Sequence, residues 1–366
     1  REESFVLGTV FDVAGPSYRK PGAGMLVGRD GSRVGLISGG CLERDVVRQA
    51  FEWTEDGPRT VVFDMRSDEL NPEGPYGTGC EGLVQLLLER VEPGKEEPLA
   101  TLVAGLEERE PTVQATIFAD EDDGALVGSR FFTGDGSSGA DLSEPVEGEL
   151  RAVMDEASNW ARPKTVLLEG GGAELKALVE PIRPPIDLLV FGAGDDVQPV
   201  ARLGHQMGWD VRIASTRPTL ATPERFPNAN SLRCEPVGVL LDRIDVHSQS
   251  HVLIMTHDLE TDAELIPPML DSDAPFVGLL GPRSRTKKVL QRLQSKGRLP
   301  EPGQLERLQT PLGLDLGGEA PSEVALSIVS AVLAAHRGGS GEVLQDREQR
   351  IHPSHERLER TAESNE

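Results

Sequence analysis

The sequence predicts an α/β protein of two domains, the second of which is built on a doubly wound parallel sheet. Residues 185–217 read as an apolar strand, a glycine turn, a helical pattern and a second strand. Residues 251–295 continue the alternation of strand and helix, which is typical of a parallel sheet. The 366 residues allow a second hydrophobic core, so the N-terminal half is expected to form a mixed α/β domain of its own.

The domain boundary is expected at Arg183-Pro184-Pro185, because two prolines directly precede the first strand of the parallel sheet. We therefore expect an N-terminal domain over residues 1–183, a Rossmann-like domain over 184–337 and a charged tail over 338–366. Residues 133–148 have the composition of a loop and are expected to form a surface excursion of the first domain.

Apolar periodicity gives the elements in order. The N-terminal strands are expected over residues 5–13, 22–28, 34–38, 60–65, 83–91 and 112–119, with helices over 42–54 and 96–109. The C-terminal half has strands over 188–191, 251–258 and 275–281 and a helix through 286–295. Residues 319–336 form a further helix, because Pro321 suits its first turn and apolar residues recur every three or four positions.

The charge of the chain limits its partners. Asp and Glu number 61 against 37 Lys and Arg, which gives a formal net charge of −24. This field repels phosphate and argues against nucleic acid or an anionic membrane as a general partner, so an anionic ligand needs a local pocket. The acidic surplus extends far from any motif and arginine exceeds lysine, which indicates a salt-adapted, halophilic-type acidic surface.

The sequence also predicts a cytoplasmic protein with reduced thiols. No apolar run approaches the length of a membrane helix, and no signal segment opens the chain. Because the chain begins at Arg1 without methionine, we expect that an upstream segment has been removed. Three cysteines are odd in number and too few for a disulfide framework.

The Gly192-Ala193-Gly194 turn is the first candidate ligand site. Glycines between a strand and a helix let a phosphate approach the backbone, and the helix N-terminus offers unpaired N–H groups to an anion. The match to a dinucleotide fingerprint is incomplete, since Val197 replaces the third glycine and the carboxylates of Asp195 and Asp196 would repel a phosphate. The alternative is that the glycines serve only close helix packing.

The next strand ends at Ser215, where dinucleotide-binding proteins usually place an acid for the ribose hydroxyls, and Arg217 follows two positions later. This pair suits a 2′-phosphate or another anionic group better than plain NAD. Near the N-terminus, Ser17, Arg19 and Lys20 lie in a loop bounded by glycine and proline, where a hydroxyl and two cations are candidates to hold a phosphate. The alternative for this loop is a set of solvated charges.

Two cysteines lie in glycine-rich segments. Cys41 follows Gly39 and Gly40 in the first turn of an expected helix, where the N-terminus favours a thiolate nucleophile or soft metal ligand, although nearby Glu43 opposes this. Cys80 lies among glycines that free the backbone to bend around a ligand or to turn tightly. If the two thiolates share a site, it suits a soft metal or sulfur transfer, while their spacing fits no short zinc motif. The alternative for Cys41 is a small apolar side chain packed under a turn.

Seven segments occur in a fixed order: GPSYRKPGAGMLV, ISGGCLE, GTGCEG, FGAGDDVQPVARL, MTHDLETD, GLLGPRSRTKKVL and TPLGLDLGGEAPSEVALSI. Together they resemble the XdhC/CoxI family of accessory proteins for xanthine dehydrogenase and carbon monoxide dehydrogenase type molybdenum hydroxylases. The resemblance covers nearly the whole chain to about residue 335. It implies an N-terminal XdhC/CoxI domain and a C-terminal Rossmann domain.

The resemblance further implies a cytoplasmic maturation factor rather than an enzyme. Such a protein binds molybdenum cofactor (molybdopterin), shields it during sulfuration by a cysteine desulfurase, and delivers it to the apo molybdenum hydroxylase. A homodimer is expected. Molybdopterin offers a phosphate, a dithiolene and a polar pterin, so it calls for glycine-rich N–H groups, cations and thiols.

The candidate site residues combine these motifs. The candidate catalytic residues are Cys41, Cys80 and His257, and the two cysteines are also the candidate metal ligands. The candidate cofactor-binding residues are Ser17, Arg19, Gly39, Gly40, Gly79, Gly192, Gly194, Arg217, Asp258, Arg283, Arg285 and Asp315.

The chain departs from the family pattern at three positions. Asp195 stands where many members have histidine, Glu81 stands where glycine is common, and Ser215 stands where an acid is usual. The first and third changes weaken ordinary dinucleotide binding, and the second adds a charge near a thiol.

Two other functions stay open at this point. In an NAD(P)-dependent oxidoreductase, Arg217 would read the 2′-phosphate and His257 would donate a proton. In a nucleotide-sensing scaffold the cysteines would be inert. A structural role is the alternative for His257, and solvated charges at a helix start are the alternative for Arg283 and Arg285.

Overall fold

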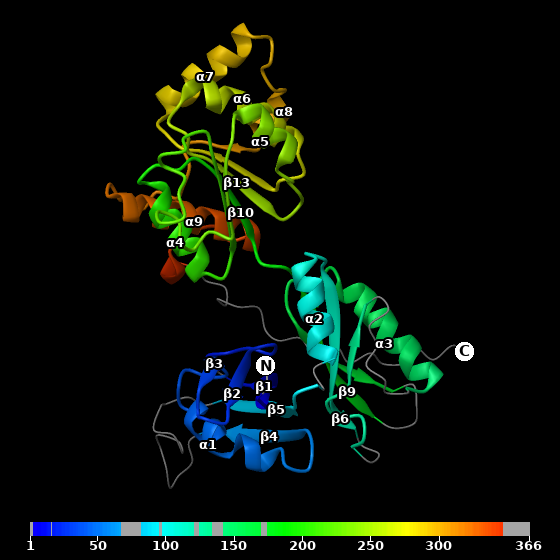
Figure 1. The fold of residues 1–366 in the computed structure, drawn as a ribbon. Coiled ribbons are helices and arrows are strands. Elements are labelled where there is room, and N and C mark those ends of the chain that lie inside the picture. The colour runs from blue at the N-terminus through cyan, green and yellow to red at the C-terminus, as the bar shows by residue number, and fades with distance from the viewer. Residues whose placement is uncertain are drawn as a thin grey trace, which may run out of the picture. The chain divides into compact units, whose positions relative to one another are not determined.

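The structure is a computed structural model, which describes residues 3–15, 17–66, 82–94, 97–120, 124–133, 142–169 and 174–346. The chain forms two compact units, whose boundary in sequence falls between Pro184 and Pro185. Both units contain helices and strands, and the second contains a parallel sheet, so the predicted α/β fold class is confirmed (Figure 1). No helix in the described ranges is long and apolar enough to cross a membrane.

Unit 1 begins with an antiparallel sheet in the strand order β3-β2-β1-β5-β4. Val6 and Val10 alternate with more exposed residues along the first strand, so one face of the sheet is buried. Helix α1 packs Val46 and Ala50 into the same core. The bounds are β1 (Phe5–Ala14), β2 (Gly24–Gly28), β3 (Arg33–Gly35), α1 (Glu43–Trp53), β4 (Arg59–Asp64) and β5 (Leu83–Val91).

The second sheet of unit 1 is also antiparallel, with the order β7-β6-β9-β8. The prediction of a loop over residues 133–148 is wrong at its C-terminal end, because helix α3 begins at Glu144 with Pro145 in its first turn. Its apolar residues, including Leu150 and Val153, pack on this sheet. The bounds are α2 (Glu97–Glu107), β6 (Thr112–Asp120), β7 (Arg130–Phe132), α3 (Glu144–Ala157), β8 (Lys164–Leu168) and β9 (Leu175–Ile182).

Unit 2 is a doubly wound sheet whose described strands are all parallel, in the order β12-β11-β10-β13-β14-β15. Helices α4 and α9 pack on one face of the sheet, and α5, α6, α7 and α8 pack on the other (Figure 1). The bounds are β10 (Asp187–Phe191), α4 (Val197–Gln206), β11 (Asp210–Ser215), β12 (Ser231–Cys234), α5 (Val237–Arg243), β13 (Ser250–Ile254), α6 (Leu259–Asp271), β14 (Phe276–Leu279), α7 (Arg283–Ser295), α8 (Pro302–Leu305), β15 (Leu308–Gln309) and α9 (Pro321–Arg337).

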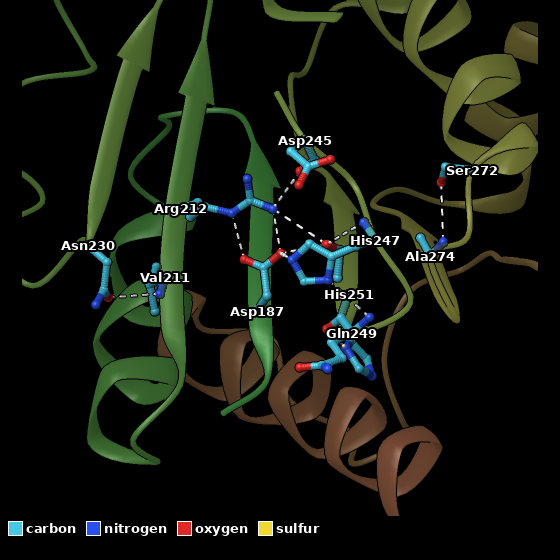
Figure 2. Close-up of polar contacts among 11 residues, drawn as sticks. Asp187, Val211, Arg212, Asn230, Asp245, His247, Gln249, His251, Ser272 and Ala274 are labelled. Carbon is cyan, nitrogen blue, oxygen red and sulfur yellow. Dashed lines mark hydrogen bonds and ion pairs between the residues drawn. The ribbon is translucent and has the colours of Figure 1, made fainter. Parts of the chain in front are cut away.

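A buried carboxylate connects three strands at the amino edge of this sheet (Figure 2). Asp187 begins β10 and is 1% exposed. Arg212 of β11 donates to both of its oxygens, with Nε 2.6 Å from Oδ1, and the hydroxyl of Ser250 in β13 donates to Oδ2 at 2.5 Å. His247 Nε2 lies 3.4 Å from the same oxygen. The cluster therefore fixes the register of the three central strands.

Another buried carboxylate lies between the two sheets of unit 1. Glu180 of β9 is 7% exposed and accepts a hydrogen bond from Gln114 Nε2 at 3.3 Å. Burial raises the pKa of Glu180 to about 7, while the charge of Arg130 and the Gln114 hydrogen bond oppose the shift. Arg130 itself forms a buried bidentate ion pair with Glu89.

We expect Asp187→Ala to lower the free energy of unfolding by about 3 kcal/mol, because it leaves the Arg212 guanidinium without its buried partner. Arg243→Ala removes a more exposed ion pair with Glu235 and is expected to cost less than about 1 kcal/mol. Denaturant titration measures both values. Equal losses in the two variants would contradict the role given to Asp187.

We expect Glu180→Gln to stabilise the protein increasingly as pH rises. A carboxyl whose pKa is higher in the folded state contributes stability below its unfolded value, 4.5, and loses it as pH rises through about 7. The gain over the unmodified protein should approach roughly 3 kcal/mol at pH 8. Thermal or chemical unfolding between pH 4.5 and 8 measures it, with exposed Glu107→Gln as the control. A gain independent of pH would contradict this assignment.

Candidate functional site

A pocket lies at the carboxyl edge of the parallel sheet of unit 2. Strand β10 pairs with β11 on one side and with β13 on the other, so the chain reverses its direction across the sheet at this point. Open α/β sheets place ligands in the crevice at such a switch point. The pocket is lined by Phe191, Gly192, Ala193, Gly194, Ala214, Ser215, Thr216, Arg217, Leu220, Val237, Leu240, Thr256, His257, Thr261 and Leu265.

The turn contains glycine at two positions for different structural reasons. Gly192 has a φ of +142°, and a Cβ there would lie 2.3 Å from the carbonyl oxygen of Met255. Gly192 is therefore required by the close approach of the chain that follows β13. A Cβ on Gly194 would lie 2.4 Å from Asp196 Oδ1 and 3.6 Å from His257 Cδ2. Gly194 thus leaves room for two side chains above the turn.

Asp196 and His257 meet across this turn. His257 Nε2 lies 2.9 Å from Asp196 Oδ2, and His257 adopts a φ of +59°, which is uncommon for a residue other than glycine. Asp196 occupies the N-cap position of α4 but makes no capping hydrogen bond, because its carboxylate faces the histidine. His257 therefore lines the pocket. In the first turn of α4 the N–H of Gln198 is left without a side-chain cap, while Pro199 has no N–H to offer.

The carboxylate of Asp195, next to Asp196, also has a cationic partner. Asp195 Oδ1 accepts from Arg225 at 2.9 Å, and the same guanidinium donates to the carbonyl of Ala193 at 3.2 Å. The repulsion expected from two acids at the helix start is therefore reduced by one cation and one histidine. Arg225 lies in a loop thirty residues along the chain and carries no motif, so sequence patterns gave no signal for it.

Arg217 is the cation of this pocket without a carboxylate partner. Its backbone N–H donates to Ser215 Oγ at 3.1 Å, and its guanidinium forms no ion pair within the described residues. Asp258 caps α6 by accepting from the N–H of Thr261 at 2.8 Å. That hydrogen bond, with smaller contributions from Arg217 and Arg285, lowers the pKa of Asp258.

Asp258 and three other predicted binders of unit 2 lie outside the lining of this pocket. Arg285 donates through Nη2 to Asp262, 2.6 Å away, whose carboxylate is buried. Burial raises the pKa of Asp262 although hydrogen bonds from Thr256 and Arg285 oppose the shift. Arg283 is exposed at the start of α7, and Asp315 is exposed in the loop after β15.

In unit 1 the structure brings two predicted motifs together. The ring of Tyr18 lies against Gly39, since a Cβ on that glycine would be 3.7 Å from Tyr18 Cγ. The loop that carries Ser17 and Arg19 therefore contacts the turn that leads to Cys41. Ser17 Oγ donates to the carbonyl of Arg19 at 2.7 Å, and the buried Arg19 Nε has no hydrogen-bond partner among the described residues.

Cys41 precedes helix α1, whose first residue is Glu43, so its predicted place in the first turn is wrong. The reason is a buried hydrogen-bond cluster. Ser38 donates its hydroxyl proton to Glu43 and accepts from Gly40 N–H at 3.1 Å, Leu42 N–H at 3.2 Å and Cys41 Sγ at 3.5 Å. Burial opposes ionisation of Glu43, but hydrogen bonds from Ser38 and Ile37 outweigh it and lower the pKa of Glu43.

The second cysteine motif, with Gly79 and Cys80, lies outside the described residues, so whether the two thiols approach each other stays a prediction. Cys41 and Cys234 are free and half-buried. Across the described ranges, no group of three or more His, Cys, Asp or Glu side chains is arranged to hold a metal ion.

We expect Glu43→Gln to lower the free energy of unfolding by about 1 to 2 kcal/mol and to speed alkylation of Cys41 by iodoacetamide, because the Ser38 cluster loses its charged acceptor. Asp45→Asn removes a charge from the same helix start outside this cluster, so it should cost less than about 1 kcal/mol and leave the alkylation rate unchanged. Peptide mass spectrometry measures alkylation at Cys41 alone. An unchanged alkylation rate in Glu43→Gln would contradict the control of the thiol by this cluster.

Comparison with known proteins shows similarity in both units. The model of the XdhC and CoxI family matches residues 1–64, and that of the XdhC Rossmann domain matches residues 188–332. A protein of Bacillus subtilis (strain 168), named as a probable subunit of xanthine dehydrogenase, is 28% identical over 337 residues, which cover 92% of this chain and 94% of that protein.

Two further matches span most of the chain. The "Molybdenum cofactor insertion chaperone PaoD" of Escherichia coli (strain K12) is 21% identical over 327 residues, which cover 89% of this chain and 82% of that protein. A crystal structure described as a xanthine dehydrogenase from Bacillus halodurans has a TM-score of 0.74 at 29% identity and covers 96% of this chain and 95% of its own. The chain therefore belongs to the XdhC and CoxI family, as its sequence motifs predict.

Proposed function

We propose that this chain is a maturation factor that binds molybdenum cofactor and delivers it to an apo molybdenum hydroxylase of the xanthine dehydrogenase or carbon monoxide dehydrogenase type. The names of its relatives support this role: one is a molybdenum cofactor insertion chaperone, and another is a probable subunit of xanthine dehydrogenase. The role requires binding and release without turnover. A cysteine desulfurase as sulfur donor and a homodimeric state belong to the same proposal.

The observation that carries the proposal is the electrostatics of the pocket in unit 2. The two acids at the start of α4, beside the pocket, are paired with Arg225 and His257, while Arg217 forms no ion pair in the described chain. One guanidinium and the uncapped N–H of Gln198 in the first turn of α4 therefore favour a phosphate near Gly194, in a chain that otherwise repels anions. Molybdopterin carries such a phosphate on a polar pterin.

Unit 1 carries a separate candidate binding element. The unpartnered Nε of Arg19 and the thiol of Cys41 lie on two loops in contact. A thiol is a soft ligand of the kind that molybdenum and sulfur chemistry require, and a guanidinium binds an anion. The two elements are proposed separately, and different variants test them.

The NAD(P)-dependent oxidoreductase is the second candidate, and one observation favours it. Ser215 and Arg217 line the same pocket as the glycine turn, where a 2′-phosphate would lie. The incomplete fingerprint opposes this candidate, because Val197 stands where the third glycine of a dinucleotide-binding turn allows close packing of the helix on the strand.

We expect purified molybdenum cofactor to bind the chain, with affinity reduced at least tenfold by Arg217→Ala and by Cys41→Ser, since each removes a charged or soft contact. Equilibrium titration followed by cofactor fluorescence measures this. Arg243→Ala and Cys234→Ser are the matched controls and should leave affinity unchanged.

A parallel titration with NADPH separates the candidates. No NADPH binding is expected in the micromolar range. Tight NADPH binding that is lost in Arg217→Ala, together with no binding of molybdenum cofactor, would contradict the proposed function and support the oxidoreductase.

A further inference from the structure

Helix α7 and the turn after it carry a charge opposite to that of the whole chain. Residues 283–298 contain seven lysines and arginines and no acid, within a protein of net charge −24. Three of these cations have acidic partners on α6: Arg285 pairs with Asp262, while Arg292 and Lys296 pair with Glu260. Packing of α7 on α6 therefore accounts for three of the seven.

The other four cations have no acidic partner on α6. Arg283, Lys287, Lys288 and Arg298 are exposed and form no ion pair within the described part of the chain. Exposed like charges on one helix repel one another and reduce stability slightly, so nothing in the folding of unit 2 requires them. Their concentration in one segment of an acidic protein indicates an acidic ligand for this surface.

A groove runs along the same segment. We call it the α7 groove; it is lined by Arg283, Thr286, Lys287, Leu290, Gln291, Gln294, Leu299, Leu305 and Thr310. Among the described residues no acid lines it, and Leu299 is 43% exposed. Two cations beside three leucines form a surface that binds a peptide segment with carboxylates and one apolar side chain.

The position of the groove relates it to the pocket. Arg283 follows β14 and His257 follows β13, and these strands are parallel neighbours. The groove therefore starts at the same carboxyl edge of the sheet as the pocket, after the neighbouring strand, and continues along α7.

We propose that the α7 groove is the docking surface for the apo molybdenum hydroxylase and receives an acidic segment of that enzyme with an apolar side chain against Leu299. This inference rests on the proposed function, because it takes the client of that function as the partner. It assigns Arg283, a predicted cofactor ligand, to the protein interface instead. Polyanionic nucleic acid fits this surface less well, because leucines line the groove and the net charge of −24 repels a long phosphate chain.

The test uses the full chain, loaded with molybdenum cofactor, and the purified apo form of its xanthine dehydrogenase. Arg283→Glu/Lys287→Glu is expected to weaken binding to the apo-enzyme at least tenfold, to reduce the salt dependence of binding and to leave cofactor affinity unchanged. Leu299→Asn should also weaken binding at least threefold. The matched control is Lys288→Glu/Arg298→Glu, which makes the same charge change on the same segment outside the groove lining and should weaken binding less than threefold.

The outcomes separate this inference from the proposed function. Failure of the unmodified chain to bind the cofactor would contradict the proposed function itself. Normal cofactor binding with no affinity for the apo-enzyme would overturn the docking surface together with the delivery step of the proposed function. Equal affinity for the apo-enzyme in the groove variant and the unmodified chain would overturn the docking surface alone. An equal loss in the groove variant and its control would also overturn it, as would a variant that loses affinity only for duplex DNA or anionic vesicles. Unchanged circular dichroism spectra and melting temperatures are required of each variant.

Discussion

The close contact between Gly192 and the carbonyl of Met255 determines the geometry of the carboxyl edge of unit 2. Only a residue without Cβ fits there, because a Cβ would lie 2.3 Å from that oxygen. The contact brings the ends of β10 and β13 together and so places His257 beside Gly194 and Asp196. The pocket and the position of its histidine beside the start of α4 both follow from this one approach of two backbones.

Pairing of charges explains how an acidic chain keeps surfaces that attract anions. Around the pocket the acids are satisfied locally, with Asp195 on Arg225 and Asp262 on Arg285. Arg217 in the pocket and the free cations of α7 keep their positive charge available. The long-range field repels anions in general, so only ligands that reach these local positions gain from them. This arrangement is compatible with the proposed phosphate-bearing ligand and the proposed acidic partner.

Sequence reasoning succeeded where the information is local. The alternation of strand and helix in the second half and the glycine turn at residue 192 predicted the parallel sheet, and ordered motifs predicted the family. It failed where a partner lies far along the chain. Neither the Asp196–His257 pair nor the burial of Arg285 against Asp262 has a sequence signal, because each depends on loops that only the sheet brings together. The predicted place of Cys41 in a helix missed Ser38, whose hydroxyl donates to Glu43 and accepts from Cys41 in the turn before the helix.

The most direct test of the account is a crystal structure of the chain with molybdenum cofactor bound. We expect the cofactor phosphate to lie at the Gly192–Gly194 turn of unit 2, within hydrogen-bond distance of the Arg217 guanidinium. A phosphate bound elsewhere, with the pocket filled only by the chain's own side chains, would contradict it.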